Sequence, residues 1–269
     1  MSEAEEKEFL EAKKYFETVK KKYAEDPKKD SFNALVCGES GTGKTYLART
    51  ARKPVHLDSF DPGGTKGLRK YIDKGEIIAD TRWEKEDRTK PSVYRDWKNE
   101  MAYRGRIGYY SHIGTYWLDS ATTWGEAIMN WVLSKASLAG DIPRFTKDYQ
   151  PQKFQIRNWL TKLLALPCDF VLTAHLKFDA DNDAKDLRYR MLTTGDGVAI
   201  IPLMFDEVYV AYTKESADGL KYSLITKNVG KYLGSTRIGA ETFDTYEKPD
   251  IKALLKKAGL PASDKPLLT

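Results

Sequence analysis

The chain has 269 residues, of which 41% are hydrophobic and 12% aromatic, which is enough for one large domain, alone or with appendages. Its formal charge of +5 is a mild surplus that is compatible with a nucleic-acid partner but does not establish one. The sequence contains no apolar run of about 18 residues and no N-terminal signal peptide, so we expect no membrane partner and a cytoplasmic protein.

Residues 1–30 are highly charged and predict one amphipathic helix. Apolar side chains recur at roughly helical spacing from Phe9 to Tyr23, and Asp26 with the proline after it ends the pattern. The apolar face fits two arrangements, which are packing on the chain's own domain or docking on a neighbouring subunit.

An apolar run from Phe32 to Cys37 predicts a buried parallel strand that leads directly into a glycine-rich loop. The loop consists of Gly38, Glu39, Ser40, Gly41, Thr42, Gly43, Lys44 and Thr45. It matches G-x-x-x-x-G-K-[ST], the P-loop that binds the phosphates of a nucleoside triphosphate through backbone N–H groups. Lys44 is expected to reach the β- and γ-phosphates, and the Thr45 hydroxyl to ligate Mg²⁺. Helical spacing resumes at Tyr46, so strand, loop and helix come in the order that the motif requires.

Further strands and helices alternate along the chain. Strands are predicted at residues 54–58, 76–80, 114–119 and 169–174, and helices at 93–104, 122–136 and 154–164. A closing hairpin is predicted at 207–213 and 222–226, with a last helix at 251–258. This alternation predicts an α/β fold with a mostly parallel central sheet, helices on both faces and a C-terminal antiparallel hairpin.

Two segments interrupt the alternation. Residues 81–110 form an insertion that is dense in charged and aromatic side chains. Residues 177–197 lose all periodicity, which predicts a long loop that is functional or mobile. We therefore divide the chain into an N-terminal helix (1–30), a core (31–245) that includes both segments, and a C-terminal helix and tail (246–269).

Cysteine and histidine add no further chemistry by their spacing. Cys37 and Cys168 lie in apolar runs and are predicted to be buried, reduced thiols without a disulfide framework. The three histidines show no spacing with cysteine that suggests a zinc site.

Polar residues at the ends of three predicted strands are candidates for the chemistry around Lys44. Asp119 ends an apolar strand and fits a Walker B carboxylate that holds Mg²⁺; the alternative is a cap of the next helix. Asp58 and Asp61 follow the second strand, where one of them would orient or deprotonate the attacking water; the alternative is a turn carboxylate. His175, at the tip of the fourth strand, fits a γ-phosphate sensor or a histidine satisfied by local hydrogen bonds.

A basic cluster follows the closing hairpin and consists of Lys227, Lys231 and Arg237. These side chains fit an arginine-finger role at the γ-phosphate of a neighbouring subunit, or a solvated basic turn. The first role requires that nucleotide lie at a subunit interface.

These motifs, in this order, resemble the RecA-like recombinase ATPases, and most closely the small phage-encoded RecA-like ATPases linked to single-strand annealing. The matching stretches are Gly38–Thr45, Leu57–Gly64, Trp117–Trp124, Phe170–His175 and Thr226–Gly239, within about residues 32–240. The resemblance implies a RecA-like fold, bound ATP and Mg²⁺, and head-to-tail homo-oligomers, as rings or filaments, with nucleotide at the interface. It also implies single-stranded DNA as a partner, with a single-strand-binding protein as a further candidate.

In this family the loop after the sensor strand binds single-stranded DNA, which corresponds here to residues 178–197. The side chains suited to phosphate contact and base stacking are Lys177, Lys185, Arg188, Tyr189 and Arg190. Acidic side chains oppose them: Asp179, Asp181, Asp183 and Asp186. The family's water-activating glutamate has no counterpart, since only Asp58 and Asp61 follow the second strand, and His175 stands where bacterial RecA has a glutamine. Hydrolysis is therefore expected to be slow or DNA-stimulated.

Three functions are consistent with the sequence. The first is an ATPase that acts on single-stranded DNA in phage-type recombination, annealing or replication. The second is a nucleotide-dependent switch or assembly factor with a protein partner in phage genome handling, which the acidic residues of the long loop favour. The third is a small-molecule kinase, which would need an arginine-rich lid that the sequence does not contain.

Overall fold

The computed structural model describes residues 2–180, 187–193, 197–217, 219–239 and 241–268, in two compact units, Met1–Ser31 and Phe32–Thr269. The first unit is helix α1 (Glu3–Ala24), followed by a short 3₁₀ turn. A capping box starts the helix, because the side chains of Ser2 and Glu5 each accept a hydrogen bond from the other's backbone N–H. The predicted N-terminal helix is confirmed, and none of its residues is buried.

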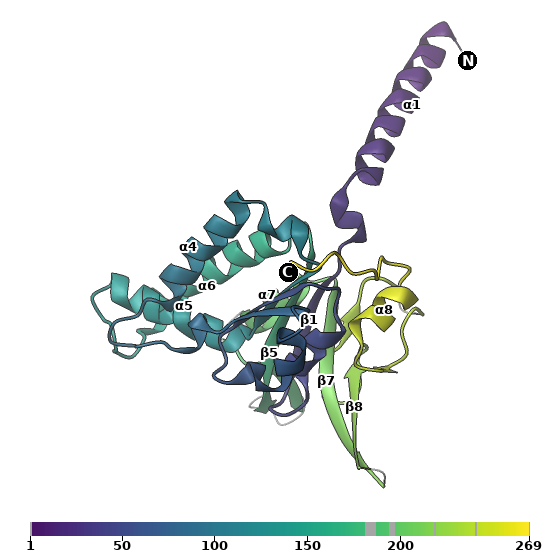
Figure 1. The fold of residues 1–269 in the computed structure, drawn as a ribbon. Helices are drawn as coiled ribbons and strands as arrows, with labels where there is room; N and C mark the ends of the chain where they lie inside the picture. Colours follow the sequence, from purple (N-terminus) through teal and green to yellow (C-terminus); the bar gives the residue numbers. More distant parts are fainter. Residues whose placement is uncertain (1, 181–186, 194–196, 218, 240, 269) are drawn as a thin grey trace. The chain divides into compact units, whose positions relative to one another are not determined.

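The second unit is an α/β domain built on one mostly parallel sheet (Figure 1). Its strands are β1 (Asn33–Gly38), β2 (Val55–Ser59), β3 (Ile77–Asp80), β4 (Thr115–Asp119), β5 (Asp169–Ala180), β6 (Leu187–Met191), β7 (Glu207–Ser216), β8 (Gly219–Ile225), β9 (Ser235–Thr236) and β10 (Tyr246–Glu247). The strand order is β10-β8-β7-β1-β5-β4-β2-β3, in which the strands from β7 to β3 are parallel and β8 is antiparallel to β7. The predicted fold class, with its closing hairpin, is confirmed.

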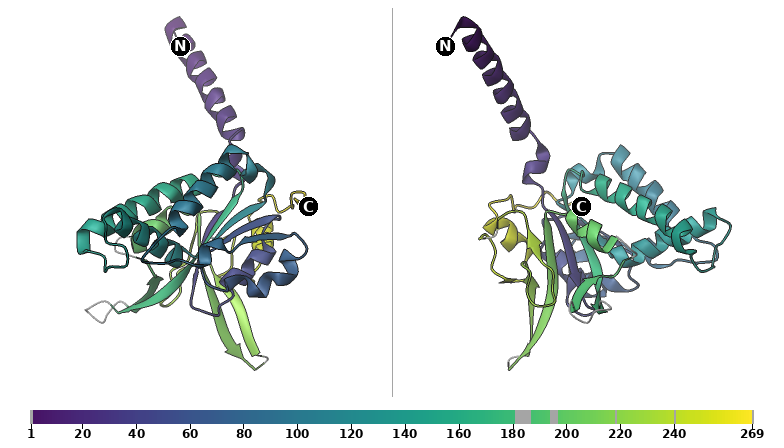
Figure 2. Two further views of the ribbon diagram at one scale, coloured as in Figure 1. Left: turned by 60° about the vertical axis from the view of Figure 1, so that its left-hand side comes forward. Right: turned by 180° about the vertical axis from the view of Figure 1, so that it is seen from behind.

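Helices cover both faces of the sheet (Figure 2). They are α2 (Lys44–Leu47), α3 (Arg69–Ile72), α4 (Val93–Arg106), α5 (Ala121–Lys135), α6 (Phe145–Leu163), α7 (Gly197–Leu203) and α8 (Ile251–Lys257). Because successive side chains of a strand point to opposite faces, β1 contributes to two separate cores. Leu35 belongs to the core beneath α4, α5 and α6, whereas Val36 belongs to the core that contains residues of α2 and α8.

The parallel strands bring the predicted site residues to one edge of the sheet. Gly38, where the P-loop begins, is in register with His175 on β5, and Ser59 on β2 is in register with Asp119 on β4. The carboxyl ends of neighbouring parallel strands form the crevice in which open α/β sheets bind their ligands. The fold therefore positions a candidate site at this edge.

The prediction of an irregular loop over residues 177–197 is wrong for the part of this segment that the structure describes. Strand β5 continues to Ala180 and pairs antiparallel with β6, and α7 begins at Gly197. Leu187, Tyr189 and Met191 alternate with two arginines, which is a strand pattern that the surrounding charges obscured. We name this pair of strands the β5–β6 hairpin.

The insertion at residues 81–110 is part of the core. Trp97 of α4 is fully buried and its ring centre lies 5.6 Å from that of Trp124 on α5 and 4.8 Å from that of Trp159 on α6. Trp83 is buried on the same face. The aromatic side chains of the insertion thus fill the space between the sheet and its helical layer.

The two cysteines are buried free thiols, as predicted. Burial raises the pKa of both Cys37 and Cys168 to about 12, so both are neutral at physiological pH. None of the described helices is both long and apolar enough to cross a membrane.

Candidate nucleotide-binding site

The P-loop has a backbone that requires glycine. Gly41 and Gly43 have φ values of +80° and +84°, in the left-handed region that other residues rarely adopt. At Gly38 a Cβ atom would lie 2.6 Å from the Thr42 hydroxyl oxygen and 2.9 Å from the Ala211 carbonyl oxygen. Three of the loop's glycines are therefore demanded by its geometry, as expected for a loop that wraps a phosphate.

Lys44 lies within the concave side of the loop. Its Nζ donates hydrogen bonds to the carbonyl oxygens of Gly38 (2.9 Å) and Glu39 (2.8 Å). Burial lowers the pKa of Lys44, and the carboxylates of Asp119 and Asp61 partly oppose this effect. The ammonium is thus held where the phosphates of a bound nucleotide would lie.

Thr45 and Asp119 form a hydrogen-bonded pair beside the P-loop. The Thr45 hydroxyl donates to Oδ2 of Asp119 at 2.5 Å, and the Thr173 hydroxyl donates to the other carboxylate oxygen. Burial raises the pKa of Asp119, against the effect of these two hydrogen bonds. A hydroxyl and a carboxylate are the oxygen donors that Mg²⁺ prefers, so this pair fits the ion. The N-cap position of helix α5 is Ser120 and not Asp119, and the Ser120 side chain makes no capping hydrogen bond.

Asp61 faces the same cavity. Its Oδ2 lies 2.9 Å from Nε2 of His175, and its Oδ1 accepts hydrogen bonds from Ser120 (2.9 Å) and Thr123 (2.5 Å). Burial raises the pKa of Asp61, but the hydrogen bonds from His175, Thr123 and Ser120 outweigh it, and the net pKa is lowered. Asp61 also begins the predicted turn, since its carbonyl oxygen accepts from the Gly64 N–H at 3.1 Å.

His175 lies on β5 and contacts both Asp61 and Leu192, the residue that follows β6. Its backbone N–H donates to the Thr122 hydroxyl at 3.3 Å, and its carbonyl oxygen accepts from the N–H of Leu192 at 2.7 Å. The Thr122 hydroxyl in turn donates to the Leu192 carbonyl oxygen at 3.1 Å. The end of the hairpin is therefore tied to the residue that holds Asp61.

The family assignment follows from the sequence that surrounds this site. Residues 31–238 match the model of the AAA_24 family, which is described as an AAA domain. The chain belongs to the AAA_24 family. No curated protein matches it in sequence.

Two solved structures are similar to this AAA_24 protein at low sequence identity. A KaiC-like protein from the hyperthermophilic archaeon Pyrococcus horikoshii OT3 is 16% identical, with a TM-score of 0.41 over 76% of this chain and 82% of that one. An ATPase from the type III secretion system of pathogenic bacteria is 13% identical, with a TM-score of 0.46. That match covers 77% of this chain and 58% of the secretion ATPase.

Asp58 lies apart from the P-loop of the AAA_24 domain. It is fully buried on the face of β2 that packs against α4. There its carboxylate accepts hydrogen bonds from Trp83 and Trp97 at 2.9 Å and from Tyr116 at 2.6 Å. Arg104 of α4 donates to both carboxylate oxygens, at 3.1 and 3.0 Å. The structure therefore brings Asp61 to the P-loop but places Asp58 among the aromatic side chains of the insertion.

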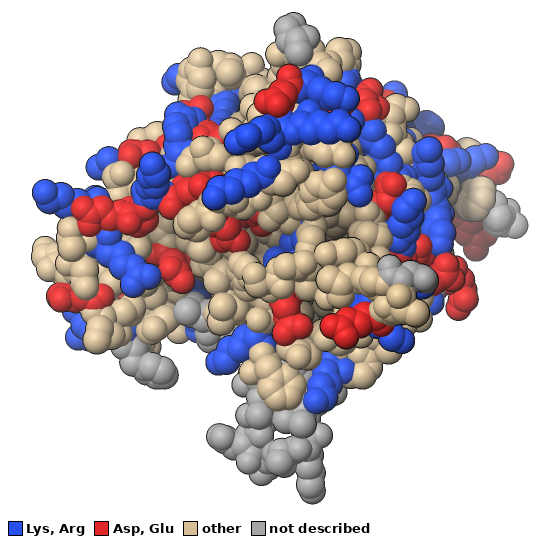
Figure 3. Space-filling view, turned by 60° about the horizontal axis from the view of Figure 1, so that its bottom comes forward, with Lys and Arg blue, Asp and Glu red and all other residues tan. Residues whose placement is uncertain are grey.

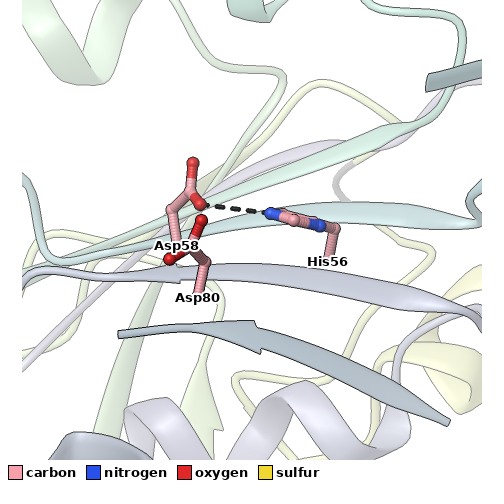
Figure 4. A group of neighbouring side chains, drawn as sticks. All are labelled: His56, Asp58 and Asp80. Carbon is pink, nitrogen blue, oxygen red and sulfur yellow. Dashed lines mark hydrogen bonds and ion pairs between the residues drawn. The ribbon is translucent and has the colours of Figure 1, made fainter. Parts of the chain in front are cut away.

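His56, Asp58 and Asp80 form a buried cluster whose potential ligand atoms lie within 4.8 Å of one another (Figure 4). Arg104 occupies the position that a cation would need, because its guanidinium lies 3.0 Å from Asp58 and 2.8 Å from Asp80. Burial raises the pKa of Asp58, but His56, Arg104 and Tyr116 lower it well below its usual range. The cluster is therefore an ion-pair network that holds α4 against the sheet.

Two adjoining cavities open at the P-loop. The first has a volume of about 550 Å³ and is lined by the P-loop together with Asp61, Thr123 and His175. The second, of about 530 Å³, shares glycines with the first and is otherwise lined by Tyr46, Leu47, Arg49, Tyr222, Lys248 and Pro249. We name it the aromatic cavity. Nothing in the spacing of these residues indicated that they meet.

Arg49 gives the aromatic cavity an unused hydrogen-bond donor. Its guanidinium carbon lies 4.6 Å from the centre of the Tyr46 ring, and its buried Nε has no hydrogen-bond partner among the described residues. Across the cavity, the ring of Tyr222 lies 3.6 Å from the position of a Cβ at Gly43. Two half-exposed tyrosine rings and a donor thus flank the end of the P-loop.

The three basic residues proposed to act in trans do not form one cluster. The Lys231 ammonium lies 5.0 Å from the centre of the Phe178 ring, against the β5–β6 hairpin. Arg237 donates to the Leu203 carbonyl oxygen at 2.5 Å and follows β9, which pairs with the amino end of β7. Arg237 is therefore at the sheet edge opposite the P-loop of its own chain, and Lys227 follows β8.

The candidate DNA-binding residues lie on or beside the β5–β6 hairpin. Lys177 is on β5, and Arg188, Tyr189 and Arg190 are on β6, whereas Lys185 lies outside the described residues. The Tyr189 ring stacks on Tyr232, with ring centres 4.8 Å apart and planes within 3°. Acidic and basic side chains are interspersed over the coloured part of the face where the hairpin ends (Figure 3).

Proposed function

We propose that this AAA_24 protein binds ATP with Mg²⁺, hydrolyses it slowly, and uses the nucleotide state to control the β5–β6 hairpin. The observation that carries the proposal is the contact of His175 with both Asp61 and the hairpin. Single-stranded DNA is the ligand that we assign to the hairpin, in recombination, annealing or replication of the phage type.

The two cavities support a nucleotide as the ligand. The cavity at Lys44 and Thr45 has the backbone, cation and hydroxyl suited to a triphosphate with its metal ion. The adjoining aromatic cavity offers the faces of Tyr46 and Tyr222 to a base that extends past Gly43. A base that stacks on an aromatic side chain gains about 1–3 kcal/mol, as measured by alanine substitution in nucleic-acid-binding proteins.

Asp61 is suited to orienting the attacking water. Its lowered pKa keeps the carboxylate ionised at neutral pH, so it accepts a hydrogen bond from water readily but is a weak base. Lys44 would stabilise the charge that develops on the transferred phosphoryl group. Mg²⁺, held by Thr45 and Asp119, would neutralise phosphate charge when bound. A weak base at this position is the physical reason for slow turnover.

His175 is suited to reporting the state of the γ-phosphate. It lines the phosphate cavity and shares Asp61, so loss of the terminal phosphate would alter the hydrogen bonding of both side chains. The backbone of His175 is bonded to Leu192 and Thr122, which carry that change to the base of the hairpin.

The exposed side of the hairpin has the chemistry of a single-strand site. The Phe178 side chain is 44% exposed, and the Lys231 ammonium lies 5.0 Å from the centre of its ring. Lys177, the preceding residue of β5, adds positive charge on the other face of the strand. Aromatic faces with nearby cations bind successive bases and phosphates without sequence preference. In a head-to-tail homo-oligomer, ring or filament, the hairpins would line up along one strand, with Lys227, Lys231 or Arg237 offered to the neighbour's nucleotide.

A nucleotide-dependent switch or assembly factor with a protein partner is the second candidate. The mixture of acidic and basic side chains on the face of Figure 3 favours it, because such a surface attracts the DNA backbone less than a continuous basic one. In this case the oligomeric state would follow ATP while DNA affinity would be negligible.

Turnover with and without single-stranded DNA tests the proposal. At low salt we expect slow hydrolysis that rises when an oligonucleotide is added, together with measurable binding of that oligonucleotide. Hydrolysis or ATP-dependent assembly without DNA binding or stimulation would favour the switch. Absence of ATP binding would refute both candidates.

A further inference from the structure

The carboxylate of Glu84 closes the loop that carries Asp61. Glu84 ends a 3₁₀ helix (Arg82–Glu84) that follows β3. Its Oε1 accepts a hydrogen bond from the Ser59 hydroxyl at 2.8 Å, and its Oε2 accepts one from the Gly63 N–H at 2.9 Å. The two donors stand on either side of Asp61. We propose that Glu84 is a positioning residue that fixes Asp61 opposite the P-loop; this rests on the proposed hydrolysis.

Backbone contacts with β4 hold the start of this loop, because the N–H groups of Phe60 (2.6 Å) and Asp61 (3.3 Å) both donate to the carbonyl oxygen of Asp119. Glu84 adds a side-chain contact beyond Asp61, at Gly63. Gly63 has a φ of +74°, and the turn is closed by one backbone hydrogen bond from Gly64 to the Asp61 carbonyl oxygen. The Ser59 hydroxyl also lies 3.4 Å from that carbonyl oxygen. Glu84 thus contacts both ends of the segment whose middle residue faces His175.

The insertion at residues 81–110 holds Glu84 in turn. The neighbouring Trp83 is 5% exposed, stacks on Phe60 at 6.5 Å between ring centres, and donates its indole N–H to Asp58. Arg104 anchors the same Asp58 from α4. The insertion therefore stabilises the loop that carries Asp61 through Glu84. In this way residues 81–110 would affect the nucleotide site although they do not line it.

Glu84 is not among the residues that line the phosphate cavity, whereas Asp61 is, so the Glu84 side chain acts through the loop and not on water. Glutamine can keep this bridge, because its oxygen can accept from Gly63 while its amide donates to the Ser59 oxygen. Alanine cannot. A positional error of about 1 Å at a reacting group costs on the order of 100-fold in rate. Glu84→Ala is thus expected to lower kcat about 10- to 100-fold at an unchanged KM, and Glu84→Gln to restore it.

Glu86 supplies the matched control. It lies two residues further along the same segment and accepts hydrogen bonds from the backbone N–H groups of Ser92 (3.0 Å) and Val93 (3.4 Å) at the start of α4. Glu86→Ala removes a carboxylate with two donors, as Glu84→Ala does, but leaves the Asp61 loop intact. Its kcat should equal that of the wild-type protein below its unfolding temperature.

The experiment measures kcat, KM, the pH profile and amide hydrogen exchange of residues 59–64 for Glu84→Ala, Glu84→Gln and Glu86→Ala. We expect faster exchange and lower kcat in Glu84→Ala alone. Equal loss in Glu84→Ala and Glu86→Ala, or unchanged exchange in Glu84→Ala, would overturn the proposal. Loss of activity in Glu84→Gln with a changed pH profile would make Glu84 a catalytic carboxylate instead. If the wild-type protein binds ATP but does not turn it over, the proposed hydrolysis is refuted, whereas faster exchange in Glu84→Ala than in the wild-type protein would still support the loop contact.

Discussion

Asp61 and His175 are 114 positions apart in the sequence, yet the carboxylate oxygen of one lies 2.9 Å from the ring nitrogen of the other. The contact joins the loop after β2 to the middle of β5, across the end of β4, whose following residues Ser120 and Thr123 donate to the same carboxylate. In the proposed mechanism this hydrogen-bonded pair would carry a change at the terminal phosphate to the β5–β6 hairpin, because the backbone of His175 is bonded to Leu192.

Replacement of His175 by alanine should separate nucleotide binding from its effect on DNA. ATP affinity is expected to stay nearly unchanged, since Lys44 and the P-loop amides remain. Stimulation of hydrolysis by single-stranded DNA should be lost, because the link from Asp61 to Leu192 is cut. The measurements are ATP affinity with a fluorescent analogue, and turnover against oligonucleotide concentration. The exposed His112 supplies the control variant His112→Ala, and wild-type DNA stimulation in His175→Ala would contradict the sensor role.

Lys44→Ala should abolish hydrolysis and leave the fold intact. The ammonium donates only to two P-loop carbonyl oxygens in the described hydrogen bonds, and burying it costs free energy, so stability should not fall. Loss of a charged donor to phosphate weakens ATP binding by about 10- to 100-fold, and turnover by at least about 100-fold. Turnover and thermal unfolding check the prediction against Lys70→Ala, which alters an exposed lysine on α3. Unchanged turnover in Lys44→Ala would refute the site.

Tyr222→Ala should weaken the binding of ATP but not that of inorganic tripolyphosphate. The Tyr222 ring lines the aromatic cavity, which adjoins the phosphate cavity without containing Lys44. Loss of one stacking face costs about 1–3 kcal/mol, or about 5- to 150-fold in the ATP dissociation constant. Titration calorimetry with ATP and with tripolyphosphate gives the ratio of the two dissociation constants directly.

Tyr222→Phe should keep the wild-type ratio of the two affinities, because the ring and not the hydroxyl supplies the stacking. Tyr103→Ala, at a similarly exposed tyrosine on α4, is the control for loss of an aromatic surface residue. If Tyr222→Ala weakened both ligands equally, the variant would have disturbed the P-loop and the base would lie elsewhere.

Local patterns predicted the parts of the site that come from strand ends. The order of apolar strand, P-loop and helix is contiguous in sequence, and the carboxyl ends of parallel strands must meet at one edge. Together these facts placed Asp61, Asp119 and His175 near Lys44 before any contact was known. The same reasoning failed to separate Asp58 from Asp61, since both follow an apolar strand. Asp58 is still on β2, with its side chain on the face that α4 covers, whereas Asp61 lies in the loop beyond the end of the strand.

The remaining contacts have no local signature because their partners come from distant segments. The donors to Asp58 are 25, 39 and 46 positions away from it in the sequence, at Trp83, Trp97 and Arg104. Tyr222 comes near the P-loop because β7 pairs with β1. The β5–β6 hairpin is a different case. Its alternation of apolar and basic residues is a local signal, but the charge density around it masked the pattern.

Asp58→Asn should destabilise the protein strongly, because it leaves the buried guanidinium of Arg104 without its main counter-charge. Removal of one partner of a buried ion pair costs about 3–5 kcal/mol. The pKa of Asp58 is lowered below its ordinary value of 3.8, so the stabilisation is fully present above about pH 4 and is lost as the pH falls through the folded-state pKa. Urea denaturation at pH 7 and pH 3 measures both effects.

The acid dependence distinguishes this contribution from a loss of packing. The free energy of unfolding of the wild-type protein should fall more steeply between pH 4 and pH 2 than that of Asp58→Asn, because the variant lacks the carboxylate that must be protonated. Asp96→Asn, at a half-exposed aspartate on α4, removes the same charge at the surface and should change stability little. Equal urea midpoints for Asp58→Asn and Asp96→Asn at pH 7 would show that Arg104 does not depend on Asp58, and the insertion would then need another anchor on the sheet.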